Sequence, residues 1–135
     1  MKSRLLYRIS AALTLLFAIG HSSGFPWSDS SWRVDTGAMR SSHFQVLGTS
    51  RTYWDFYIGF GLTISVFLLL AAILAWELGA LSAQASPLMR VTAWALPLCF
   101  AALTVLNCMY FFVIPIVFSS VITVCLFGAA ALSPR

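Results

Sequence analysis

The sequence predicts an all-α protein: a transmembrane four-helix bundle that forms a single membrane domain over residues 1–135. Two runs without Asp, Glu, Lys or Arg carry this prediction: residues 56–76 span 21 positions and residues 91–132 span 42. A bilayer core of about 30 Å takes roughly 20 residues of apolar helix, so the first run holds one span and the second holds two. The composition agrees, since 60% of the residues are hydrophobic and 9% are charged.

The first span is predicted over residues 5–20, an apolar stretch that follows a basic start with Lys2, Arg4 and Arg8. The same pattern is typical of a secretory signal peptide, for which Ser22–Gly24 offers a cleavage region. We favour a retained span, because no Ala-x-Ala site follows it and because the arginine side chains can extend to the lipid headgroups. Cleavage of this segment is the alternative.

Three more spans are predicted over residues 53–81, 89–110 and 115–132. The second charge-free run is too long for one helix and has the length of a helical hairpin. Pro115 suits the first turn of the last span, where a helix does not need the backbone N–H that proline lacks. A short turn at Gln84–Leu88 separates the second span from the third.

The loop between spans one and two, residues 21–52, is the only sizeable polar segment. Met39, His43, Val46 and Leu47 recur in it at helical spacing, behind Asp35 or Thr36 as a start signal, and Gly48 closes the run. This pattern predicts a short amphipathic helix over Thr36–Leu47 that lies on the membrane or caps the bundle. A plain surface helix without a role in binding is the alternative.

Four spans place both termini on one side of the membrane, and the basic residues indicate which side that is. Five of them fall on the side of the termini and three on the other side. Because the positive-inside rule counts basic residues, we expect both termini in the cytoplasm. The five are Lys2, Arg4, Arg8, Arg90 and Arg135, and the three are Arg33, Arg40 and Arg51.

Polar residues on all four spans fall at a similar depth, near the outer side. On span two, Asp55 and Glu77 share a face and lie about 33 Å apart along the helix, which places one acid at each interface. Acids within membranes point into the bundle, and the outer acid shares its depth with polar groups of the other spans. We therefore predict an outward-opening pocket with a lid. Its lining would be His21, Asp55, Gly59, Thr104, Asn107 and Ser119, and its lid Arg51, His43 and Met39.

The same polar residues have a second interpretation, in which they only hold the helices together. A polar side chain between membrane helices contributes roughly 1 kcal/mol, and His21 and Asp55 would then pair with each other or with loop backbone. A metal or haem site needs at least two well-placed ligands. Since His21 and His43 are the only histidines, we predict no metal site and no cofactor.

The cysteines and the net charge exclude two further classes of function. Cys99, Cys108 and Cys125 form no Cys-x-x-Cys pair, so we expect buried thiols that act as small hydrophobic groups rather than a redox centre. The net charge of +4 comes from eight basic residues at helix ends and in one loop. This distribution is typical of charges that set membrane topology, and we expect no nucleic-acid partner.

One stretch of the chain resembles a known family. Its elements are Gly20-His21, then Met39-Arg40-x-x-His43-Phe44, then Arg51-Thr52-x-Trp54-Asp55-Phe56-Tyr57-x-Gly59-Phe60-Gly61-Leu62. Together with Leu78-Gly79 and Tyr110-Phe111-Phe112-x-x-Pro115, this pattern resembles an uncharacterised family of small four-span bacterial integral membrane proteins. The resemblance covers most of the chain. It implies a four-span fold in a bacterial inner (plasma) membrane and implies no activity, cofactor or substrate.

These observations favour a binding or accessory protein in the lipid bilayer. Its pocket would hold a small amphiphile such as a lipid, quinone or isoprenoid, or the bundle would dock a membrane partner. The small residues Ala71, Ala75 and Gly79 permit close helix contact, either inside the bundle or in a homo- or hetero-oligomer. The alternatives are a membrane enzyme, with His21 as acid or base and Asp55 orienting it, or a small transporter.

Overall fold

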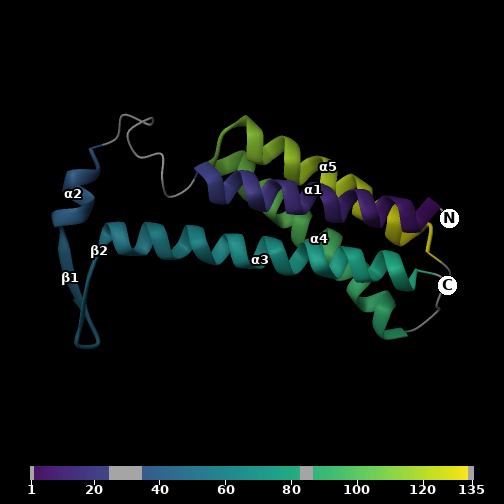
Figure 1. The fold of residues 1–135 in the computed structure, drawn as a ribbon, viewed down its shortest axis with the longest axis horizontal. Coiled ribbons are helices and arrows are strands. Elements are labelled where there is room, and N and C mark those ends of the chain that lie inside the picture. Colours follow the sequence, from purple (N-terminus) through teal and green to yellow (C-terminus); the bar gives the residue numbers. More distant parts are fainter. Residues whose placement is uncertain (1, 25–34, 83–86, 134–135) are drawn as a thin grey trace. The chain divides into compact units, whose positions relative to one another are not determined.

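The structure is a computed structural model, and it describes residues 2–24, 35–82 and 87–133 of the chain. The predicted turn at Gln84–Leu88 lies mostly outside these residues. Within them, seven elements follow one another along the chain (Figure 1). In order they are α1 (Lys2–Gly24), α2 (Thr36–Ser41), β1 (His43–Val46), β2 (Thr49–Thr52), α3 (Tyr53–Leu81), α4 (Pro87–Tyr110) and α5 (Val113–Ala131).

Four of the described helices are long and apolar enough to cross a membrane, and they confirm the all-α, multi-pass prediction. Helix α3 has the predicted bounds, and the third span, Met89–Tyr110, agrees within a residue or two. Helix α1 is longer than predicted at both ends, and α5 begins two residues before Pro115. Pro115 therefore lies in the first turn of α5, where its missing N–H costs no helical hydrogen bond.

The segment between α1 and α3 corrects one prediction. A helix was expected over Thr36–Leu47, and the structure confirms only its first half, α2, which Asp35 caps by accepting a hydrogen bond from the Gly37 N–H at 3.0 Å. From His43 onward the expectation is wrong, because the chain forms an antiparallel β-hairpin. Apolar positions in so short a run fit either period, and alternation through Phe44 and Val46 fits a strand.

The hairpin is closed by a two-residue turn at Leu47 and Gly48. Its register pairs Phe44 with Arg51 and Val46 with Thr49. Both turn residues have positive φ, +50° and +79° respectively, which is the conformation that a tight turn needs to match the twist of two strands. Gly48 adopts this conformation without steric cost, whereas in Leu47 the Cβ makes a positive φ sterically unfavourable.

The chain divides into two compact units, one comprising Met1–Phe17 with Leu68–Arg135, the other Ala18–Phe67. In the first unit, α4 and α5 form a helical hairpin, and buried side chains recur at helical spacing on α5. Phe17 of α1 stacks on Phe118 of α5 with ring centroids 5.3 Å apart. The largest side chains with less than 2% exposure in this unit are Tyr7, Ser10, Thr14, Pro97, Ser119, Ile122 and Leu126.

Glycines mark where the start of α1 packs against the ends of two other helices of the first unit. A Cβ added to Gly79 of α3 would lie 3.2 Å from the Tyr7 Cβ, and one added to Gly128 of α5 would lie 3.3 Å from the Leu6 Cδ1. Figure 1 shows the first turns of α1 and the last turns of α5 at the same end of this unit. Gly79, with the buried Ala75, thus serves packing inside the chain.

We expect the substitution Gly79→Leu to destabilise the protein, because its side chain must enter space that Tyr7 occupies. Overpacking of this kind typically costs about 1–3 kcal/mol. Thermal or denaturant unfolding in detergent measures the loss. Gly20→Leu is the matched control, since a Cβ at Gly20 of α1 would meet nothing within 4 Å. Equal stability of the two variants would contradict this packing.

Candidate functional site

The residues predicted to line one pocket belong to two separate units. His21, Asp55 and Gly59 lie in the unit Ala18–Phe67, whereas Thr104, Asn107 and Ser119 lie on α4 and α5 in the other. The predicted lid residues Met39, His43 and Arg51 lie in the same unit as His21. Each set has its own hydrogen-bond partners.

Asn107 and Ser119 tie α4 to α5 close to the turn between them. The Asn107 Nδ2 donates to the Ser119 Oγ at 3.1 Å and to the Pro115 carbonyl at 3.2 Å. One turn further along, the Thr104 and Thr123 hydroxyl oxygens lie 3.3 Å apart. Asn107 is 4% exposed and Ser119 is fully buried. These contacts match the second interpretation of the sequence, in which polar groups hold helices together.

His21, in the last turn of α1, contacts the backbone of α3. Its Nε2 lies 3.1 Å from the Gly61 carbonyl oxygen, so this ring nitrogen carries the proton and donates. The neighbouring Ser22 hydroxyl lies 3.0 Å from the Ser65 hydroxyl. Gly61 and Ser65 are one helical turn apart, and their small size lets α1 approach. His21 and Ser22 together hold the last turn of α1 against α3 at Gly61 and Ser65.

Asp55 begins α3 through a reciprocal pair of hydrogen bonds with Thr52. The Asp55 Oδ2 accepts from the Thr52 N–H at 2.8 Å, and the Thr52 Oγ1 accepts from the Asp55 N–H at 3.1 Å. This arrangement is a capping box, which satisfies backbone donors that a helix start leaves open. Arg51 and His43 lie next to this box, since Arg51 precedes Thr52 in the chain and His43 is the cross-strand partner of Thr52.

The structure therefore does not bring His21 and Asp55 together as the pair that the sequence suggested. Each has a separate hydrogen-bond partner, and the partner of His21, Gly61, lies six residues beyond Asp55 on α3. Six residues correspond to about 9 Å along a helix axis. An acid–base role in which Asp55 orients the His21 ring has no support from these contacts.

An exposed row of aromatic rings in this unit is a feature that the sequence did not predict. We call Phe44, Tyr53, Phe56 and Phe60 the aromatic ladder. Phe44 of β1 lies 5.2 Å from Tyr53 and 5.1 Å from Phe56, and Phe60 continues the row at 5.7 Å from Phe56. Tyr53, Phe56 and Phe60 are 60%, 44% and 64% exposed. Their spacing of three and four residues was the signal that could have found them.

Cationic side chains lie beside this row. The Arg40 guanidinium of α2 stacks on the Trp54 ring, 3.8 Å from the ring centroid. The Trp54 ring in turn contacts the Tyr57 ring, with their centroids 5.4 Å apart. Arg51 of β2 is exposed and donates one hydrogen bond to the Ser50 carbonyl at 2.9 Å. His43 is exposed at the start of β1, and Met39 is half-buried in α2. The predicted lid residues thus belong to α2 and to the hairpin that carries Phe44 of the ladder.

The cysteines correct a further expectation. All three are free, as predicted, but Cys99 and Cys108 are exposed on α4 and only Cys125 is partly buried. In a membrane-spanning helix an exposed apolar side chain faces lipid, so these thiols need no buried site. No group of three or more His, Cys, Asp or Glu side chains within the described ranges could hold a metal ion.

The arrangement combines a broad apolar surface with cations at its edge, which is suited to binding a molecule that is apolar at one end and charged at the other. Comparisons of the chain with protein-family models, with curated proteins and with solved structures find no match.

We expect the Thr52→Val and Asp55→Ala substitutions to be energetically coupled, because each removes one side-chain acceptor of the same capping box. Their combined effect on thermal stability should be smaller than the sum of the separate effects. His21→Ala combined with Asp55→Ala should instead be additive, since the two side chains have different partners. Coupling between His21 and Asp55, with none between Thr52 and Asp55, would contradict the observed arrangement.

Proposed function

We propose that this multi-pass membrane protein is a binding or accessory protein of the bacterial inner membrane, and that its outer end holds a small amphiphile. The aromatic ladder carries the proposal. Tyr53, Phe56 and Phe60 expose much of their surface although each of them contacts another ring of the ladder. Rigid rings bury large apolar area on binding and lose little side-chain entropy, which suits them to holding an acyl chain, an isoprenoid or a quinone ring.

The charges beside the ladder support an amphiphile with an anionic or polar headgroup. Arg51 is the cross-strand partner of Phe44 of the ladder, and it has donors beyond the one that bonds Ser50. A guanidinium recognises phosphate and carboxylate groups through paired N–H donors. The proposal thus assigns the apolar body of the ligand to the rings and its headgroup to Arg51.

The proposed orientation places the ladder outside and both termini in the cytoplasm. Packing of the first turns of α1 near the last turns of α5 is consistent with termini on one side. The excess of basic residues on that side supports a cytoplasmic location.

A reporter enzyme that works only in the cytoplasm checks this orientation. Fused after Arg135, it should be active, and inserted into the loop between α1 and α2 it should be inactive. A reporter that is active only in the periplasm, fused at the same two positions, provides the control and should give the reverse pattern. Periplasmic activity of the fusion after Arg135 would contradict the proposed topology.

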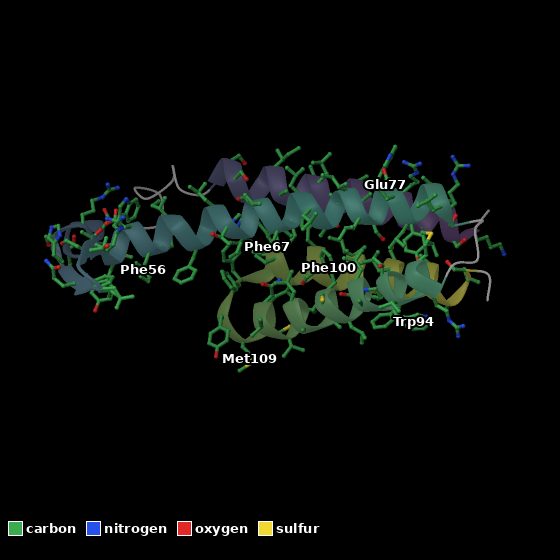
Figure 2. The ribbon with its side chains drawn as sticks, turned by 90° about the horizontal axis from the view of Figure 1, so that it is seen from below. Phe56, Phe67, Glu77, Trp94, Phe100 and Met109 are labelled. Carbon is green, nitrogen blue, oxygen red and sulfur yellow. The ribbon has the colours of Figure 1, made fainter. Side chains whose placement is uncertain are left out.

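Native mass spectrometry of the protein, purified in mild detergent, tests the binding function. We expect a stoichiometric adduct that the Phe60→Ala variant retains at least about tenfold less, since loss of a well-buried aromatic contact exceeds 1.4 kcal/mol. Phe67→Ala is the matched control, because Phe67 lies on the same helix with the same exposure of 64% but outside the ladder (Figure 2).

Two outcomes of this experiment would contradict the proposal. One is an equal loss of the adduct in the Phe60 and Phe67 variants, which would indicate general lipid association. The other is a wild-type protein without a small-molecule adduct but in complex with a second protein, which would favour docking of a membrane partner. The ladder is supported as the binding site when Phe67→Ala retains the adduct and Phe60→Ala loses it.

A further inference from the structure

The β-hairpin has an apolar side that the proposed ligand does not explain. We propose that this hairpin lies in the headgroup region of the outer leaflet and inserts its tip, Val46 and Leu47, among the lipids. The partner of this surface is thus the bilayer that surrounds α3. The inference is independent of which ligand the aromatic ladder binds.

The direction of the hairpin is the first observation. β2 ends at Thr52 and α3 begins at the next residue, so the base of the hairpin lies where the span starts. Figure 1 shows the hairpin crossing the direction of α3 rather than continuing it away from the helix end. When α3 crosses a bilayer, a hairpin in this orientation runs along the membrane surface.

The contacts of Phe44 indicate which face of the hairpin looks toward the lipid. Side chains alternate between the two faces of a strand, so Phe44 and Val46 share a face with their cross-strand partners Arg51 and Thr49. Phe44 contacts both Tyr53 and Phe56, and Phe56 lies one turn deeper in the span. The face that carries Phe44 therefore points toward the hydrocarbon, whereas Gln45 and Ser50 belong to the face that points to water.

The tip of the hairpin is the third observation. Leu47 is 100% exposed and Val46 is 49% exposed. Leu47 also has a φ of +50°, a conformation in which Asn or Gly is favoured in a two-residue turn. A fully exposed leucine in an unfavourable backbone conformation would be disfavoured in water. Lipid around the tip explains why an apolar side chain stands at this position.

The neighbouring residues fit the boundary between lipid and water. Trp54, Tyr53 and Tyr57 are of the types that gather at membrane interfaces. Arg51, on the lipid-facing side of the hairpin, is placed to meet lipid phosphates, which attract basic side chains. The aromatic ladder joins Phe44 to Phe56 and Phe60, so the apolar side of the hairpin continues the exposed apolar surface of α3.

Site-directed fluorescence tests the proposal in the full chain. Cys99, Cys108 and Cys125 are replaced by alanine, and the environment-sensitive dye NBD is attached to single variants Val46→Cys, Leu47→Cys, Gln45→Cys and Ser50→Cys. The proteins are reconstituted into vesicles of phosphatidylethanolamine and phosphatidylglycerol. Quenching by a lipid that carries a doxyl group near its headgroup is compared with quenching by aqueous iodide.

We expect dyes at positions 46 and 47 to have blue-shifted emission, to be quenched by the doxyl lipid and to be shielded from iodide. Dyes at positions 45 and 50 should show the opposite pattern. Adding Leu47→Asn to the Val46→Cys protein should shift the dye at 46 toward water, although asparagine suits the turn and keeps the hairpin. Adding Leu47→Met, which stays apolar, should leave the dye at 46 in lipid.

Three results would overturn the proposal. Strong iodide quenching at position 47, equal to that at position 50, would show a tip in water. Shielding from iodide without doxyl quenching would show a tip that is covered by protein. An unchanged signal at position 46 after Leu47→Asn would show that the apolar character of the tip does not hold it in the membrane.

Discussion

Hydrogen bonding in surroundings without water is the constraint on which the rest of this structure depends. A polar group that faces lipid or a helix interior has no solvent to bond, and leaving it unpaired is costly. Several short hydroxyl side chains meet this constraint by donating to the carbonyl one turn earlier. Ser10, Thr14, Thr63, Thr104, Ser119 and Thr123 all donate to the carbonyl oxygen four residues before them.

This local bonding limits what the polar groups within the spans can do. A hydroxyl whose hydrogen is used for its own helix can still accept a hydrogen bond, as the Ser119 Oγ accepts from Asn107. Asn107 differs from the hydroxyls that bond their own helix, because its amide donates to two groups of α5. These polar contacts hold α4 and α5 together. Among the described residues, the exposed aromatic ladder and the basic side chains beside it lie near the start of α3.

The spans could be predicted from the sequence because charge is absent over long runs, and no tertiary contact is needed to make an apolar helix in a bilayer. The hairpin could not, because His43, Val46 and Leu47 fit a helical period whereas Phe44 and Val46 fit a strand period, and so few residues do not decide between the two. The hydrogen-bond partner of His21 could not be predicted from the sequence either. Depth and helical face predicted a neighbour at the outer interface, but the sequence does not show that a backbone carbonyl at Gly61 accepts from the ring.

Thr52 connects the two parts of the structure on which the proposals depend. It is the last residue of β2, paired with His43, and it is also the capping residue of α3 through its bonds with Asp55. No linker separates strand from helix, so the direction of the hairpin is set by the geometry of the helix start. Phe44 then packs on Tyr53 and Phe56 and determines which face of the hairpin turns toward the span. The orientation of the aromatic ladder and of the hairpin tip thus follows from one capping box and one aromatic contact.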